Sequence, residues 1–190
     1  MKLTPLGIEG AWAAESDVHV DHRGSFREWF KIEEIQELTG IDFSVKQANI
    51  SLSNAGVIRG IHYSVAEAGQ AKWVTCANGH IIDVIVDIRP SSPTFKKVIE
   101  VDLKGGEGCA VLIGAGLGHG FLALEDNSVV SYLLSSPYSP SNEFEINPLD
   151  PDLNIDWHLD LVGNTGHIIS PKDAQAPSLQ ERLADGRLPK

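Results

Sequence analysis

The residues best suited to chemistry lie in one short segment, Gly56-Val-Ile-Arg-Gly-Ile-His-Tyr-Ser64. Arg59 and His62 occur there beside Gly56 and Gly60, where the backbone can bend and approach a ligand closely. An arginine suits a phosphate or carboxylate, and a histidine can move protons near neutral pH. The spacing indicates a site that holds an anionic substrate beside a base, in an insert between two strand-like runs. A surface turn with an incidental histidine is the alternative for so short a motif.

Four further segments carry polar groups that could serve such a site. They contain Arg23 with Phe26 and Glu28, the amides of Gln47 and Asn49, His119 between two glycines, and Tyr132 within an apolar run. Period-two alternation places the two amides on one face of a strand. Structural roles are the alternatives: His119 also fits a hydrogen-bonded loop histidine, and Tyr132 a core residue with a satisfied hydroxyl.

A metal site is the obvious rival for a β protein that carries histidines. Metal-binding barrels usually place two histidines one residue apart on a strand, with a glutamate and a distant histidine. Here His62 is followed by Tyr63 and Ser64, and neither His80 nor His119 has a near partner in the sequence. The sequence therefore predicts no metal centre, and a metal oxygenase is the weakest functional hypothesis.

Short strands dominate the middle of the chain. Runs rich in Val and Ile, separated by Gly, Pro, Asn or Ser, occupy residues 45–52, 71–77, 81–89, 95–103, 110–113, 120–124 and 129–134. Strands this short at this spacing predict a β-sandwich or barrel. Helix is expected at 32–39, before Gly40, and after the capping box Ser178-Leu-Gln-Glu181. We expect residues 1–190 to form one β-rich domain.

Asn78-Gly79 is the dipeptide favoured in two-residue hairpin turns, so the runs on either side are predicted to pair with each other. That register puts Lys72 opposite Ile85, with Asp83 and Asp87 as diagonal neighbours. Lys72 shares its strand face with apolar residues, so its ammonium should point into an interior that supplies a counter-charge or a ligand. An edge-strand lysine whose head reaches water is the alternative.

Composition and charge limit the class of protein. A chain of 190 residues can bury roughly 70% of its unfolded surface. The net charge of −11 argues against nucleic acid or an acidic membrane as partner, so an anionic ligand would need a local cationic cluster. Cys76 and Cys109 lie in apolar runs and are expected as reduced thiols. Without a signal-peptide pattern or a membrane-length apolar run, the expected location is cytoplasmic.

Taken in order along the chain, these motifs resemble the dTDP-4-dehydrorhamnose 3,5-epimerase family, also called dTDP-sugar epimerases. The resemblance is carried by Arg23-Gly24, Phe26, Glu28, Gln47, Asn49, Arg59-Gly-Ile-His62, Lys72, Asp83–Arg89, Gly118-His-Gly-Phe121, Tyr132, Asp150–Trp157 and Ser170-Pro-Lys-Asp173. It extends from about Leu6 to the C-terminal helix, and several ordered motifs are far more specific than one.

The resemblance implies an all-β, cupin-type jelly roll with short peripheral helices that works without a metal or organic cofactor. The implied partners are a dTDP-4-keto-6-deoxyhexose substrate and a second copy of the chain. This homodimer would exchange N-terminal strands. Carried onto this sequence, the resemblance makes His62 a general base paired with Asp173, places Lys72 near the C4 oxygen, and makes Tyr132 a proton donor. The positions implied to line the sugar or nucleotide site are Arg23, Phe26, Glu28, Gln47, Asn49, Arg59, Asp83, His119, Tyr138, Glu143 and Lys172.

Some positions depart from the rhamnose-pathway enzymes of that family. Ile61 and Ser64 stand where a Leu before the histidine and a Gln two after it are common, and Leu133 stands where a Lys is frequent. These departures are more similar to epimerases of antibiotic deoxysugar pathways, some of which invert C3 alone or C5 alone. The sequence leaves open which carbon is inverted. The alternatives are a 3,4-ketoisomerase on the same substrate and a non-catalytic cupin that binds a sugar.

Overall fold

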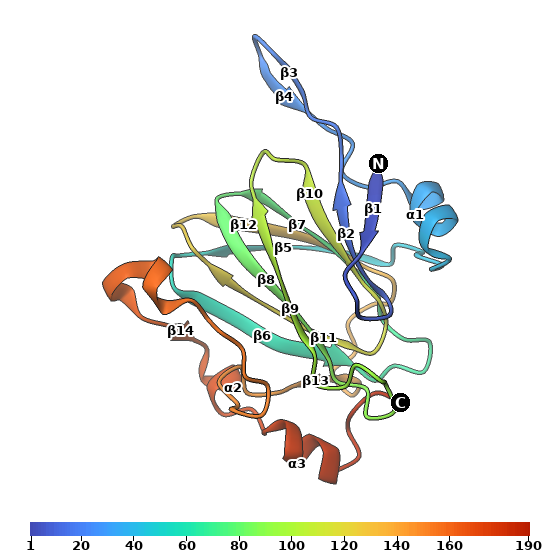
Figure 1. Cartoon of the computed structure of the whole chain (residues 1–190), viewed down its shortest axis with the longest axis vertical. Helices are drawn as coiled ribbons and strands as arrows, with labels where there is room; N and C mark the ends of the chain where they lie inside the picture. The colour runs from blue at the N-terminus through green and yellow to red at the C-terminus, as the bar shows by residue number, and fades with distance from the viewer.

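The computed structural model describes residues 1–158, 160–163 and 166–190, and it consists mainly of two facing β-sheets (Figure 1). The first sheet contains, in spatial order, β1 (Lys2–Pro5), β2 (Ala11–Glu15), β10 (Cys109–Ile113), β7 (Lys72–Asn78), β12 (Ser128–Leu134) and β5 (Gln47–Ser53). The second contains β13 (Glu143–Glu145), β6 (Val57–Ser64), β11 (Leu117–Ala123), β8 (His80–Asp87) and β9 (Val98–Lys104), with β14 (Ile168–Ile169) parallel to β6.

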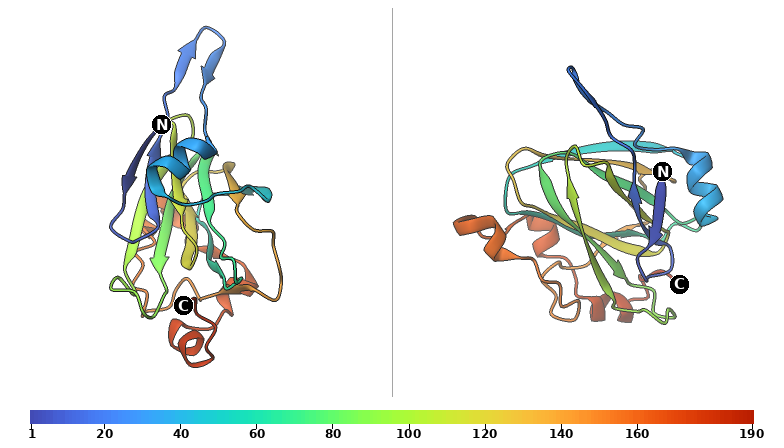
Figure 2. Two further views of the ribbon diagram at one scale, coloured as in Figure 1. Left: turned by 90° about the vertical axis from the view of Figure 1, so that its right-hand side faces the viewer. Right: turned by 45° about the horizontal axis from the view of Figure 1, so that its top comes forward.

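The remaining elements are short and peripheral. They are the hairpin of β3 (His19–Asp21) and β4 (Gly24–Phe26), the helices α1 (Ile32–Thr39), α2 (Pro171–Ala174) and α3 (Leu179–Ala184), and the 3-10 helix η1 (Leu159–Thr165). The hairpin projects well beyond the sheets in every view (Figures 1 and 2). In the described part of the chain, no helix has the length and apolar character needed to cross a membrane.

Apolar side chains fill the space between the sheets and also cover both outer faces. Val74 of β7, Ile85 of β8 and Phe121 of β11 meet in the space between the sheets. Trp73, the neighbour of Val74, points the other way and packs with residues of the segment around α1. Because side chains alternate along a strand, both faces of β7 are buried. The C-terminal segment covers the outer face of the second sheet, as the segment around α1 covers that of the first. This architecture confirms the predicted all-β sandwich, which is cupin-like.

All seven strands predicted for the middle of the chain are present, with shifted boundaries, and α1 and the capping box of α3 are confirmed. Residues 57–64 were predicted as an insert, but they form the continuous strand β6. Gly60 explains the difference. Its φ of +134° suits only glycine, and a Cβ there would lie 2.6 Å from the Cα of Gly120. The glycine therefore serves close strand approach within a sheet.

The predicted hairpin at Asn78-Gly79 is wrong. The chain passes there from the first sheet to the second, so β7 pairs with β10 and β12 while β8 pairs with β9 and β11. Lys72 consequently lies beside Ile113 and Leu134 rather than opposite Ile85. The dipeptide signals a local turn, but non-local strand pairing decides which sheet each strand joins. The interior position of Lys72 is nevertheless confirmed, since its side chain is buried.

We predict that Gly60→Ala lowers the free energy of unfolding by about 3 kcal/mol or more, because it combines backbone strain with a clash against β11. Urea unfolding at fixed protein concentration measures the loss. Gly106→Ala is the matched control: it has a φ of +88° with nothing within 4 Å of the added Cβ. Its free energy of unfolding should fall by only about 1 kcal/mol, because the variant has the backbone strain without a clash. Equal losses in the two variants would contradict the close-approach argument.

Candidate active site

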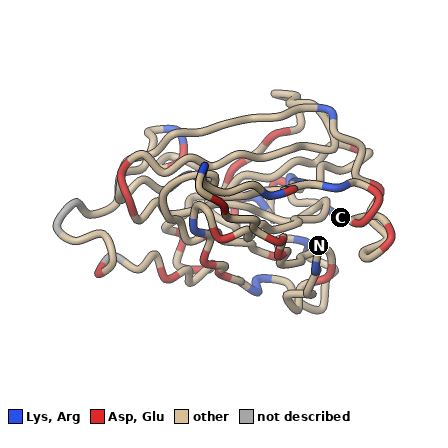
Figure 3. Tube along the Cα trace, turned by 90° about the horizontal axis from the view of Figure 1, so that it is seen from above, with Lys and Arg blue, Asp and Glu red and all other residues tan. Residues whose placement is uncertain are grey.

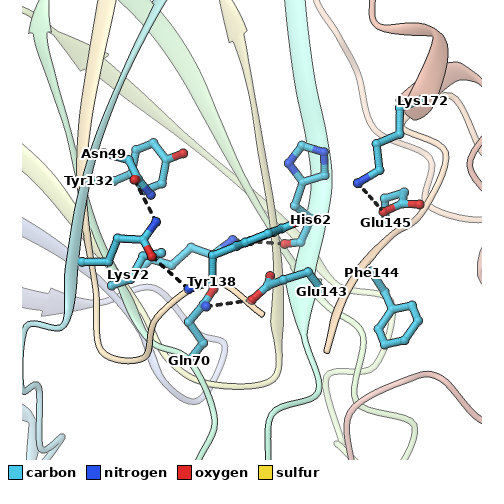
Figure 4. Close-up of a pocket in the computed structure, with 12 residues that line it drawn as sticks. Asn49, His62, Gln70, Lys72, Tyr132, Tyr138, Glu143, Phe144, Glu145 and Lys172 are labelled. Atoms are coloured by element: carbon cyan, nitrogen blue, oxygen red, sulfur yellow. Dashed lines mark hydrogen bonds and ion pairs between the residues drawn. The ribbon is translucent and has the colours of Figure 1, made fainter. Parts of the chain in front are cut away.

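A cleft of about 230 Å³, open at its mouth, lies between the two sheets (Figure 4). Strands β5, β7 and β12 of the first sheet form one wall, and β6 and β13 of the second form the other. The residues that line it are Gln47, Asn49, His62, Gln70, Lys72, Tyr132, Leu134, Tyr138, Glu143, Phe144, Glu145 and Lys172. Eight of the residues singled out from the sequence are therefore brought together.

His62 and Asp173 form a pair at this cleft although they are 111 residues apart. His62 Nε2 lies 2.8 Å from Asp173 Oδ1, with the imidazole half-exposed toward the cleft and the carboxylate buried. Ser170 positions the carboxylate by capping α2, because its hydroxyl accepts a hydrogen bond from the Asp173 backbone N–H. Burial opposes ionisation of Asp173, but the bonds from His62 and Ser170 outweigh it and hold its pKa below the usual range. An ionised carboxylate can orient the imidazole and stabilise its protonated form.

Lys72 lies at the floor of the cleft between the two walls. Its Nζ donates a hydrogen bond to the backbone carbonyl of His62 at 3.2 Å. Burial lowers the pKa of Lys72 to about 8, while the charges of Glu143 and Asp83 act in the opposite direction. Lys72 and Asp83 therefore interact across the sandwich, rather than as the strand neighbours that the predicted hairpin required.

His119 and Asp83 form a second buried pair behind this floor. His119 Nε2 lies 2.8 Å from Asp83 Oδ2, and His119 is the register partner of His62 in the β6–β11 ladder. Burial lowers the pKa of His119; Asp83 opposes that shift, and the nearby Lys72 and His62 add to it. Neither member of the pair lines the cleft, although both were predicted at the sugar or nucleotide site.

Tyr132 occupies the wall opposite His62 (Figure 4). It is the register partner of Asn49 on the neighbouring strand β5. Burial raises the pKa of Tyr132, and a hydrogen bond with Asn49 and the charge of Arg59 partly offset that rise. The predicted shared face of Gln47 and Asn49 is confirmed, because Gln47 Nε2 donates to Asn49 Oδ1 at 2.9 Å.

The rim of the cleft mixes charges of both signs. Lys172 lies 3.1 Å from Glu145, and Gln70 donates a hydrogen bond to Glu143 at 2.9 Å. The Lys172 charge, which could attract an anionic ligand, is therefore already paired with a carboxylate at the rim. Acidic residues are also spread over many other segments of the chain (Figure 3). Arg59 lies outside the lining residues and donates to the Ser53 hydroxyl and the Leu52 carbonyl.

Four of the lining residues were not predicted from the sequence: Gln70, Leu134, Phe144 and Glu145. Period-two spacing from Lys72 and Tyr132 could have found Gln70 and Leu134. Glu145 offered no such signal, because it reaches the cleft through the short strand β13, where it is the register partner of His62.

Arg23, Phe26 and Glu28 lie away from this cleft, on or just after the projecting β3–β4 hairpin. Arg23 is ion-paired with Asp21, and Glu28 with Lys31. The Phe26 ring is 66% exposed and stacks only loosely on His19. Within one copy of the chain, these three side chains do not meet the other predicted site residues.

Residues that could hold a metal do not gather anywhere in the described ranges: no group of three or more His, Cys, Asp or Glu side chains has suitable geometry. The cleft instead offers a histidine–carboxylate pair, a buried lysine and a tyrosine around one space. Such an arrangement can remove a proton from one face of a bound molecule and stabilise the resulting anion.

We predict that Lys72→Met raises the free energy of unfolding by about 1–3 kcal/mol at pH 7. The folded-state pKa of Lys72, about 8, lies below the ordinary 10.5, so its charged form opposes folding fully below pH 8. That penalty fades as pH rises from 8 toward 10.5, and the advantage of the variant should fade with it. Urea unfolding at pH 7 and pH 10 measures both. Exposed Lys104→Met is the control and should change the free energy of unfolding by no more than about 0.5 kcal/mol. A Lys72→Met advantage independent of pH would contradict the charge argument.

Comparison with known proteins identifies the family. The sequence profile described as dTDP-4-dehydrorhamnose 3,5-epimerase matches residues 5–181. A dTDP-4-dehydro-6-deoxyglucose 3-epimerase of a Streptomyces species is 44% identical over 98% of this chain and 93% of its own. A solved Mycobacterium tuberculosis epimerase is 43% identical, with a TM-score of 0.95 over 100% of this chain and 94% of that one. ChmJ, a solved 3′-monoepimerase from Streptomyces bikiniensis in complex with dTDP-quinovose, is 43% identical, with a TM-score of 0.91. The match covers 98% of this chain and 92% of that one. The chain therefore belongs to the dTDP-4-dehydrorhamnose 3,5-epimerase family.

Proposed function

We propose that the protein epimerises a dTDP-4-keto-6-deoxyglucose at C3, at C5 or at both, without a cofactor. The observation that carries the proposal is the placement of the His62–Asp173 pair and Tyr132 on opposite walls of one cleft, with Lys72 between them. Inversion of a carbon centre needs a base on one face and an acid on the other, and this cleft offers both.

The 4-keto group of the substrate acidifies the hydrogens on C3 and C5. His62 would remove one of these protons as the general base, and the ionised Asp173 carboxylate would stabilise the imidazolium that forms. The electron pair of the broken C–H bond moves into an enolate on C4. His62 is half-exposed toward the cleft and therefore accessible to a bound sugar.

The enolate oxygen needs a positive charge held ready in a water-poor site. Lys72 is buried, and with a pKa of about 8 it is mostly protonated at pH 7. Its cost to stability is consistent with a role in the reaction, because a buried ammonium without a full counter-charge is costly to fold.

Tyr132 would return a proton to the carbon from the opposite face. Transfer from its hydroxyl completes the inversion and leaves a phenolate, which the nearby Asn49 and Arg59 favour. Tyr138, Glu143 and Lys172 at the mouth of the cleft would contact the sugar nucleotide. Relatives named 3-epimerase and 3,5-epimerase are 44% and 43% identical to the chain, so identity alone does not select a carbon.

We further propose that two copies of this single-domain chain form a homodimer in the cytoplasm. Strand β5 is at the edge of the first sheet, where Ile50 and Leu52 are 76% and 59% exposed. The projecting hairpin would deliver Arg23 and Phe26 to the cleft of the partner copy, which explains their distance from their own. Two free thiols in the described structure fit a reducing compartment.

We predict that wild-type protein catalyses deuterium uptake from heavy water into dTDP-4-keto-6-deoxyglucose, and that His62→Asn abolishes it. Mass spectrometry and proton NMR identify the labelled carbon and its configuration. Label with inversion at C3, C5 or both assigns the specificity. A carbonyl moved to C3 would instead indicate a ketoisomerase, and nucleotide binding without exchange would leave only a binding protein.

The matched control is His80→Asn. His80 also contacts a carboxylate, with Nε2 2.7 Å from Asp102, but it lies outside the cleft. Exchange should stay at the wild-type rate in this variant. An unchanged rate in His62→Asn would remove that histidine as the base.

We predict that Ile50→Asp converts a dimer of twice 20.6 kDa into a monomer, because it places a charge in the apolar β5 surface. Light scattering coupled to size exclusion measures the mass. Leu183→Asp on α3, where the side chain is 42% exposed, is the control and should remain dimeric. A monomeric wild type at micromolar concentration would contradict the proposed dimer.

A further inference from the structure

Gln47 and Asn49 connect Tyr132 to the backbone of the loop that carries Tyr138. The Tyr138 backbone N–H donates to Gln47 Oε1 at 2.9 Å, and Gln47 Nε2 donates to Asn49 Oδ1 at 2.9 Å. Asn49 is in turn the register partner of Tyr132 across β5 and β12, so the two side chains are neighbours on one face of the sheet. These four residues line one side of the cleft as a row of neighbouring polar groups.

The direction of this chain of hydrogen bonds is fixed from one end. Side-chain amides can usually be turned by 180°, which exchanges their donor and acceptor. A backbone N–H, however, can only donate, so the group of Gln47 that faces Tyr138 must be its oxygen. Gln47 then has only its NH₂ to offer Asn49, and Asn49 must receive that bond on its oxygen. The NH₂ of Asn49 takes no part in these two bonds and is the only donor that Asn49 can offer to the Tyr132 hydroxyl.

We propose that Gln47 and Asn49 act as a one-way amide relay that makes the Tyr132 oxygen a hydrogen-bond acceptor and so keeps the Tyr132 proton free for the substrate. The inference rests on the proposed function, in which Tyr132 is the acid. Both amides are positioning residues here, since they act through Tyr132.

The relay has a chemical benefit at both stages of the proton transfer. Before the transfer, an acceptor in place of the Asn49 NH₂ would bind the Tyr132 proton and hold it away from the sugar. After the transfer, the Asn49 NH₂ stabilises the phenolate, which opposes the effect of burial. The same relay also explains why two adjacent inward positions of β5 are amides rather than hydroxyls or carboxylates: each member must accept at one end and donate at the other.

Gln47→Glu tests the direction of the relay from two bonds away. At pH 8 the introduced carboxylate still accepts from the Tyr138 N–H and nearly conserves shape, but it cannot donate to Asn49. Asn49 must then turn its NH₂ toward the carboxylate and its oxygen toward Tyr132, which becomes the donor. Gln47→Met is the matched comparison, because it removes both bonds without imposing the reverse direction.

The first readout needs no substrate. Titration of ¹³Cζ-labelled tyrosines by NMR, assigned with Tyr132→Phe, gives the pKa of Tyr132 in each protein. We expect Gln47→Glu to raise it by about 1 unit or more and Gln47→Met to raise it less. An unchanged Tyr132 pKa in folded Gln47→Glu, or a larger rise in Gln47→Met, would overturn the relay.

The second readout separates exchange from inversion. In Gln47→Glu, the ratio of inversion to His62-dependent deuterium exchange, both measured at saturating substrate, should fall roughly 100-fold because the acid is withheld. In the Tyr132→Phe background, Gln47→Glu should have no further effect on inversion. Equal loss of exchange and inversion, or a further loss in that background, would contradict action through Tyr132.

Failure of the proposed function would appear differently. Wild-type protein would then show no exchange at all, while the pKa comparison would still decide the direction of the relay. The two hypotheses are therefore tested separately on the same set of proteins.

Discussion

The close contact of β6 with β11 determines the geometry of the whole site. Gly60 and Gly120 allow the two backbones to approach more closely than any pair with side chains could, and His62 follows two residues later on the same strand. β13 and β14 then flank β6 on its other side, which brings Glu145 and the start of α2 to the imidazole. The His62 imidazole, its carboxylate partner and one wall of the cleft thus depend on a single strand whose path requires glycine.

The opposite wall combines a stability cost with a directional network. Lys72 is buried with its charge only partly balanced, whereas the amides of Gln47 and Asn49 are satisfied in one fixed order. A buried charge is useful to chemistry because it is poorly solvated, and an ordered network is useful because it does not reorganise during reaction. The same wall of the cleft therefore contains a buried charge that opposes folding and a hydrogen-bonded pair of amides.

Local patterns in the sequence predicted most strands, helix α1, the α3 capping box and the shared face of Gln47 and Asn49. They failed where pairing is non-local: the Asn78-Gly79 turn marks a change of sheet, and Val57–Ser64 is a strand rather than an insert. That the site residues lie together could be predicted only from the family resemblance, because no local sequence pattern connects His62 with Asp173. Glu145 and Phe144 escaped notice because a three-residue strand has too few positions to show a period.

The projecting hairpin has a genetic consequence under the proposed dimer. A chain with a defective cleft could still lend its hairpin, and a chain with a defective hairpin could still offer an intact cleft. Mixed in one cell, two such inactive alleles would assemble some dimers with one complete site, and activity would reappear. An allele defective in the hairpin and an allele defective in the cleft would therefore partly complement each other, whereas two alleles defective in the same segment would not.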